Sequence, residues 1–284
     1  MLSPGVLPGL VALLALDAPL ASSPRIEWKT LEPGIEYATV TGPGPSDLPI
    51  DPRIHLVRID PRRRRLEAVM AAGDDGKLRP AGAWCRERHL AVAINMGMYE
   101  KDERTNTGYA RKDRYLNNGH WAAKYRAALG FAPTKASAAP VLFADLDKPG
   151  EQERLAGYGT VVQNLRLIRA GQNVWQKADR RWSEAAVGVD KQGRVLFIFC
   201  RTPHAMKELN DILLALPLDL DSAMHVEGGF EASLSIHAGG VNIDLNGRYD
   251  ADPAEGERQQ WAIPNVLGVV EIRAANGVGR SIQR

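Results

Sequence analysis

The segment from Ala185 to Cys200 constrains the fold more than any other part of the chain. It reads AAVGVDKQGRVLFIFC, so two apolar runs are joined by a polar turn that contains Gly193. Two strand-length apolar runs around a short glycine-containing turn are typical of a β-hairpin. The sequence therefore predicts an antiparallel pair of strands over this segment.

A helix is expected soon after this hairpin. Apolar residues recur there at spacings of three and four, which gives a helix one apolar face; they are Met206, Leu209, Ile212, Leu213 and Leu216. Thr202 and Pro203 precede the pattern and Pro217 follows it, as expected for the two ends of a helix. Residues 81–89 also have helical composition.

Further apolar runs have the length and composition of strands. They cover residues 89–95, 127–133, 140–146, 159–168, 222–226, 233–240, 241–245 and 265–272. The apolar runs on either side of residues 62–65 predict another hairpin, with four consecutive arginines at its tip. Strands thus outnumber helices, and both hairpins and strand–helix–strand connections occur. We expect an α+β fold, a mixed, largely antiparallel β-sheet with packed helices in a single domain.

The first 23 residues are apolar and end in small residues. This composition is typical of a signal peptide, although an apolar N-terminal extension would look similar. The run is too short and too interrupted to span a bilayer. We therefore expect residues 24–284 to form the domain, and the protein to be secreted or periplasmic without a stable membrane span. Cys85 and Cys200 lie in apolar stretches, so they could pair or remain separate buried thiols.

Charge and motifs argue against several classes of protein. The chain has 36 basic and 34 acidic residues, so there is no broad positive field and we expect no nucleic-acid partner. The sequence contains neither the glycine motifs of nucleotide-binding loops nor the G-x-S-x-G nucleophile elbow. Its six histidines are scattered without the paired spacing of a zinc site. We expect no cofactor and no metal.

Several polar residues stand where predicted strands end. Asn95 ends one strand, Gln163 interrupts another, Arg201 and His204 lie between the hairpin and the helix, and Glu227 follows a fourth strand. Polar side chains that emerge at one edge of a sheet would meet in a common cleft. Asn95 could equally form a turn, and His204 could simply belong to the first turn of the helix. Gln163 lacks such a simple structural explanation, because an unpaired buried amide costs about 1–3 kcal/mol.

Residues 225–234, HVEGGFEASL, place two carboxylates, Glu227 and Glu231, around Gly228 and Gly229. Glycines allow positive φ and let a ligand approach the backbone N–H groups closely. Paired carboxylates suit acetal hydrolysis, in which one donates a proton and the other activates water or stabilises positive charge. The alternative is a turn that happens to contain two glutamates.

Residues 186–234 contain a GVD strand, a hairpin glycine, a helix and the string EGGFEASL. The matching positions are Gly188, Val189, Asp190, Gly193, Gly228, Gly229, Glu231, Ala232, Ser233 and Leu234. AINMGMY (with Asn95 and Gly97), VVQNLRLI (with Gln163) and IPNVLGVV fit the same pattern. Together these segments resemble the phosphodiester glycosidase family over about residues 50–272. The sequence departs from the family at Glu227, where members usually carry Asp, and after Gln163, where the family turn is altered.

The resemblance implies a hydrolase that cleaves a sugar-1-phosphodiester bond, with a glycan or sugar phosphate at the cell surface or outside the cell as its substrate. Arg180 or Arg181, Arg201 and the glycine backbone would bind the phosphate. The catalytic candidates are Glu227, Asn95 and Glu231. The substrate-binding candidates are Gln163, Arg201, His204, Gly228, Gly229 and Arg181.

Two other functions remain open. A non-catalytic polysaccharide-binding or polysaccharide-assembly protein could use the same fold, because the extra methylene of Glu227 can displace its carboxylate from a catalytic geometry. A divalent-metal phosphodiesterase is a third reading.

Overall fold

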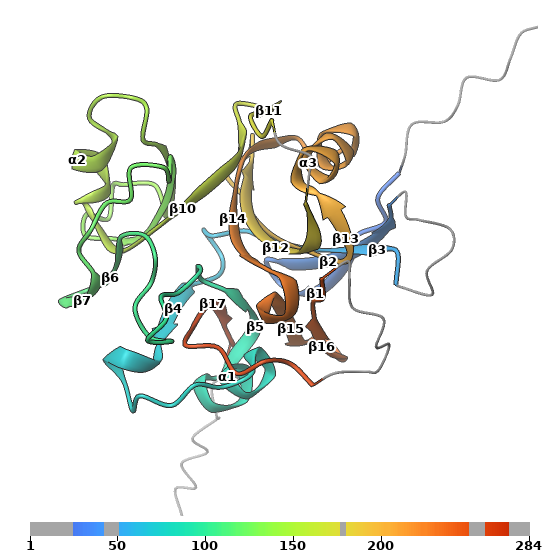
Figure 1. Cartoon of the computed structure of the whole chain (residues 1–284), viewed down its shortest axis with the longest axis horizontal. Helices are drawn as coiled ribbons and strands as arrows, with labels where there is room; N and C mark the ends of the chain where they lie inside the picture. Colours follow the sequence, from blue (N-terminus) through green and yellow to red (C-terminus); the bar gives the residue numbers. More distant parts are fainter. Residues whose placement is uncertain (1–24, 43–50, 177–179, 250–258, 273–284) are drawn as a thin grey trace, which may run out of the picture.

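The computed structural model describes residues 25–42, 51–176, 180–249 and 259–272. These residues form two β-sheets and three α-helices (Figure 1). The predicted signal peptide or extension, residues 1–23, lies outside the described residues.

The larger sheet has twelve strands. Its main path runs β1 (Lys29–Glu32), β2 (Ile35–Thr41), β3 (Arg53–Ile59), β13 (Val195–Ala205), β12 (Arg181–Asp190), β14 (Leu220–Gly228), β10 (Tyr158–Arg169), β6 (Ala110–Lys112) and β7 (Tyr115–Asn118). Off this path, β10 also pairs with β8 (Ala127–Pro133) and β11 (Gln172–Asn173), and β8 pairs with β9 (Val141–Asp145). The β12–β13 pair confirms the hairpin predicted around Gly193.

The smaller sheet has five strands, in the order β16 (Val241–Asn246), β15 (Ser233–Ala238), β5 (Leu90–Asn95), β17 (Asn265–Val270) and β4 (Leu66–Met70). Every pairing between described strands of either sheet is antiparallel. The largely antiparallel sheet is thus confirmed. The α+β prediction overstated the helices, which are short, and the described chain is predominantly β.

The core lies between the two sheets. Along β13, odd-numbered residues such as Phe197 and Phe199 pack against apolar residues of the smaller sheet, including Ile94 and Leu267. Because side chains of a strand alternate between its two faces, the even-numbered residues face the opposite way. They pack under α3 (Met206–Ala215), which covers the outer face of the larger sheet. The predicted helix is therefore confirmed, with its first residue at Met206.

The remaining helices cover other apolar surfaces. The helix α1 (Ala81–Arg88) lies on the outer face of the smaller sheet, at the bottom of Figure 1. The helix α2 (Glu151–Leu155) packs beside β9 and β10, and two single 3-10 turns are η1 (Ala71–Gly73) and η2 (Gly229–Glu231). Cys85 lies on the buried face of α1, and Cys200 packs under α3, so the two thiols belong to different clusters and are free.

The hairpin predicted around residues 62–65 is wrong. Strands β3 and β4 belong to different sheets, so the arginine segment carries the chain from one sheet to the other. Arg64 is buried there, where its Nη1 lies 2.8 Å from Glu32 Oε2 and its Nη2 donates to the Val270 carbonyl at 2.9 Å. Apolar residues of both β3 and β4 face the core between the sheets. This shared environment explains why their sequences predicted two strands of one hairpin.

Candidate active site

A cleft of about 550 Å³ opens where β14 ends. It is lined by Met98, Arg180, Arg181, Trp182, His225, Glu227, Gly228 and Tyr249. These residues come from the turn after β5, the start of β12, the end of β14 and the segment after β16. Strand ends from both sheets thus converge on one polar and aromatic cleft.

Glu227 is the carboxylate of this cleft. Its exposed fraction is only 9%, and its Oε1 accepts a hydrogen bond from the Gly228 N–H at 3.1 Å. Burial raises the pKa of Glu227 to about 7, although His225 and the Gly228 N–H act in the opposite direction. A carboxyl with this pKa can exchange a proton near neutral pH.

His225 and Glu184 form a buried pair beside Glu227. The His225 Nδ1 lies 2.7 Å from Glu184 Oε1, and Trp182 donates its Nε1–H to Glu184 Oε2 at 2.9 Å. Burial lowers the pKa of His225, but the charge and hydrogen bond of Glu184, helped by Glu227, more than offset burial and raise it. Burial also raises the pKa of Glu184, so this pair holds a proton more readily than either group would in water, next to the Glu227 carboxyl.

A β-bulge shapes β14 at this point. Ala185 of β12 pairs with Glu227, whereas the next residue, Ala186, pairs with His225, so Val226 is an extra residue. Bulges change the direction of the side chains around them and are common beside active sites. Here Val226 packs into the core between the sheets, while His225 and Glu227 both line the cleft.

The two glycines after Glu227 make room for aromatic rings. A Cβ on Gly228 would overlap the indole of Trp182, and one on Gly229 would overlap the ring of Tyr249. Gly229 also has φ +71°, a conformation that L side chains rarely adopt. The glycines therefore let two aromatic side chains lie against the backbone and form the cleft wall.

Glu231 ends the 3-10 turn η2, and Asn95 holds this turn in place. The Asn95 Nδ2 donates to the Glu231 carbonyl at 2.9 Å, and its Oδ1 accepts the Ser233 N–H at 2.7 Å. Burial raises the pKa of Tyr249, and the Glu231 and Glu227 carboxylates add to this effect. Glu231 thus lies near the cleft, whereas Asn95 is buried and bonded to the backbone behind it.

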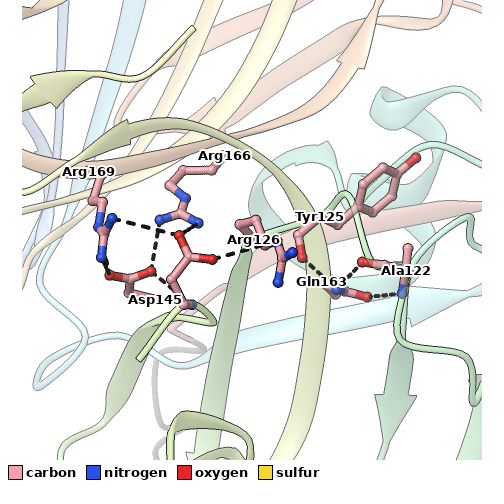
Figure 2. Close-up of polar contacts among 8 residues, drawn as sticks. Ala122, Tyr125, Arg126, Asp145, Gln163, Arg166 and Arg169 are labelled. Carbon is pink, nitrogen blue, oxygen red and sulfur yellow. Dashed lines mark hydrogen bonds and ion pairs between the residues drawn. The ribbon is translucent and has the colours of Figure 1, made fainter. Parts of the chain in front are cut away.

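Gln163 is buried among backbone groups, as Figure 2 shows. Its Nε2 donates to the carbonyls of Ala122 at 2.9 Å and Tyr125 at 2.7 Å. Its Oε1 accepts the N–H groups of Tyr109 at 3.1 Å and Ala122 at 2.9 Å. Both the donor and the acceptor of the Gln163 amide thus bind backbone groups between Tyr109 and Tyr125 and hold this segment against β10. This role explains why a polar residue occurs in an apolar strand.

Of the basic candidates, Arg180 and Arg181 line the cleft, and Arg201 and His204 do not. The Arg181 Nη1 lies 3.5 Å from Glu208 Oε2, and its side chain is 43% exposed. His204 is buried against the same carboxylate, with its Nδ1 at 3.5 Å. Arg201 lines a separate cleft beside Arg86. The structure thus brings together Glu227, Gly228 and Arg181, keeps Gly229 and Glu231 beside them, and places Gln163, Arg201 and His204 elsewhere.

The sequence analysis missed five residues of the site. They are Met98, Trp182, Glu184, His225 and Tyr249. Glu184 could have been found from the sequence, because it is a glutamate directly before the predicted strand AAVGVD, and a buried carboxylate needs a partner. No local signal pointed to Tyr249, which follows β16 and reaches the cleft through the Trp182–Tyr249 bridge.

Within the described residues, no three His, Cys, Asp or Glu side chains gather closely enough to hold a metal ion. The same part of the chain contains no helix with the length and apolarity needed to cross a membrane.

The model of the phosphodiester glycosidase family matches residues 88–270, and the chain belongs to this family. The resemblance seen in the sequence is therefore confirmed.

Solved structures share the fold. The catalytic domain of zebrafish N-acetylglucosamine-1-phosphodiester α-N-acetylglucosaminidase, auto-inhibited by its pro-peptide, aligns with a TM-score of 0.55 at 17% identity, over 89% of this chain and 86% of that one. A hypothetical protein from Synechocystis aligns with a TM-score of 0.56 at 14% identity, over 87% of this chain and 64% of that one. No curated protein sequence matches the chain. At these identities the likeness establishes the fold.

Proposed function

We propose that the protein hydrolyses a sugar-1-phosphodiester bond in the cleft around Glu227. Water would replace the phosphate at the anomeric carbon, which frees the sugar and leaves a phosphate monoester on the other partner. The single observation that carries this proposal is the nearly buried Glu227 carboxyl, with a pKa of about 7, in a cleft lined by arginines and aromatic rings.

The lining of the cleft matches the two parts of such a substrate. Trp182 and Tyr249 offer apolar ring surfaces, against which the apolar face of a sugar can be buried. Arg180 and Arg181 offer guanidinium groups, which bind phosphate oxygens with charge-assisted hydrogen bonds. The sugar would therefore lie against the aromatic wall and the phosphate near the arginines.

Glu227 would act as a base towards the attacking water. The leaving group is a phosphate monoester, whose second pKa is about 6, so it can depart without receiving a proton. The harder step is to activate water, and a carboxylate with a pKa near the working pH is suited to it. Glu231, the second carboxylate nearby, would stabilise positive charge on the sugar.

His225 and Glu184 would support Glu227. The raised pKa of His225, due to Glu184 and Glu227 acting against burial, favours an imidazolium beside the Glu227 carboxyl. That positive charge stabilises the ionised carboxylate, which is the form a base requires.

The cell-surface or extracellular setting rests on the sequence. An apolar segment resembling a signal peptide precedes the domain, and phosphodiester-linked sugars occur in surface glycans. We therefore propose a glycan outside the cytoplasm as substrate and export to the periplasm or medium.

A glycan-binding protein without turnover is the second candidate. It is favoured by the same aromatic wall, since Tyr249 is 45% exposed beside the cleft, and by the glutamate at position 227.

Release of free sugar from a GlcNAc-1-phosphodiester compound distinguishes the two candidates. The wild type should release sugar, and Glu227→Gln should lower the rate by about 10²–10⁴-fold, the usual contribution of a positioned base. Glu153→Gln, which changes an exposed carboxylate on α2, should have no effect. Wild-type protein that binds glycan but releases no sugar above the buffer rate would establish the binding function instead.

A further inference from the structure

A second cleft, of about 670 Å³, lies between α1 and the edge of β16. It is lined by Pro80, Gly82, Ala83, Arg86, Arg201, Asp244, Leu245, Asn246, Gln259 and Gln260. None of these residues lines the cleft around Glu227. The lining mixes apolar and polar residues and contains two arginines.

Arg201 reaches this cleft because of the alternation along β13. Phe199 packs into the core between the sheets, and Cys200 packs under α3. Arg201 therefore projects to the same side as Phe199, towards the smaller sheet. Among the described residues, its guanidinium has no hydrogen-bond or ion-pair partner.

The charges of the second cleft are not balanced. Asp244 is its one carboxylate among the lining residues, and its Oδ1 already lies 3.0 Å from the Nε2 of His237. Arg86 Nη1 lies 3.9 Å from Asp244 Oδ2, and its side chain is 65% exposed. Among the described lining residues, two guanidinium groups thus face one carboxylate that has another partner, which gives this part of the lining a surplus of positive charge.

The second cleft also offers groups that suit a sugar. Gln259 is an exposed residue of its lining. Gln260 is occupied, because its Oε1 accepts the Gly82 N–H at 2.8 Å and its Nε2 donates to the Leu245 carbonyl at 2.8 Å. The available donors for a ligand are therefore the guanidinium groups and an exposed amide.

A short segment separates the two clefts. Asn246 lines the second cleft, and Tyr249 lines the first. The segment runs along the start of β12, where the Arg248 N–H donates to Ser183 Oγ at 2.7 Å. Three peptide units span at most about 10 Å. A ligand longer than one sugar unit could therefore reach both clefts.

We propose that the second cleft binds an anionic group, a phosphate or a carboxylate, on a sugar unit next to the one whose bond is cleaved. This inference rests on the proposed function and names its substrate class as an anionic glycan chain. Arg201 and Arg86 bind the anionic group, and the cleft around Glu227 receives the phosphodiester.

The test measures binding of sugars that have no anomeric phosphodiester, so the result is independent of turnover. Isothermal titration calorimetry of the full chain compares maltotriose 6-phosphate, a uronic acid trisaccharide and neutral maltotriose. At least one anionic trisaccharide should bind about tenfold more tightly than maltotriose, since charge-assisted hydrogen bonds are the stronger ones. Which of the two binds identifies the group as phosphate or carboxylate.

Arg201→Gln should remove this preference, and Arg201→Lys should restore part of it. Arg63→Gln, which changes an exposed arginine in the segment between the sheets, should leave it intact. Equal binding of charged and neutral trisaccharides would overturn the proposal, as would an unchanged preference in Arg201→Gln. If sugar release fails while the preference holds, the proposed hydrolysis is wrong and the anionic site remains.

Discussion

Glu184→Gln should move the pH dependence of hydrolysis, although Glu184 itself does not line the cleft. Glu184 is fully buried, and its carboxylate supports the imidazolium form of His225. Without that charge, burial lowers the pKa of His225, and the neutral imidazole is favoured. Glu227 then loses the neighbouring charge that favours its ionised form, so its pKa rises above 7.

The size of the shift follows from the positive charge that Glu227 loses. An opposite charge within hydrogen-bonding or near-contact range shifts a carboxyl pKa by about 1–3 units. Glu184 itself repels the Glu227 carboxylate, but this effect is smaller than that of His225. We expect the acid limb of kcat/KM to move from near pH 7 to about pH 8. Loss of the buried charge should also cost about 3 kcal/mol of stability.

The assay is sugar release from the GlcNAc-1-phosphodiester compound between pH 5 and about pH 9. Asp190→Asn is a matched control, because Asp190 is a buried carboxylate on the same strand, paired with Arg194 at 2.5 Å. It should lower stability while leaving the acid limb in place. An unmoved limb in Glu184→Gln, or one that moves to lower pH, would refute the role given to His225.

Two further outcomes follow from the site. Gly229→Ala should lower the free energy of unfolding clearly more than Gly193→Ala does, and it should also raise KM. Both glycines have positive φ, so an alanine at either position costs about 1–3 kcal/mol of backbone strain. Only at Gly229 does the new Cβ also overlap a side chain, the ring of Tyr249. Equal losses in the two variants, by thermal denaturation, would contradict the packing described. Glu227→Gln should stabilise the protein at pH 8 by up to about 3 kcal/mol. Burial raises the pKa of Glu227 to about 7, so its ionised carboxylate destabilises the folded protein above pH 7, and this cost disappears below the ordinary pKa of 4.5. Urea denaturation of the wild type and the variant at pH 8 and pH 4 measures the difference in their free energies of unfolding.

Local patterns predicted the parts of the fold that local interactions determine. The turn around Gly193 and the apolar stripe of α3 are both encoded within a few residues, and both occur as predicted. The partner of a strand is a long-range property, which is why β3 and β4 were paired wrongly. Their apolar residues face one core, and nothing in the pattern distinguishes one sheet from two facing sheets.

The site was predictable where the chemistry was local. Glu227 stands directly after a predicted strand and lies in the cleft. Gln163 was singled out because a buried amide needs partners, and it has them in backbone groups of a distant loop. His225 gained its significance only from Glu184, a residue 41 positions away in the sequence. Such pairs become visible only when the strands are placed side by side.

The bond that is broken provides the most direct test of the account. Hydrolysis of the GlcNAc-1-phosphodiester compound in heavy-oxygen water labels whichever product receives the water oxygen. Attack at the anomeric carbon, with Glu227 as base, puts the label on the free sugar, and mass spectrometry of the two products detects it. Label on the phosphate monoester would mean that the phosphorus–oxygen bond breaks and would contradict the glycosidase mechanism.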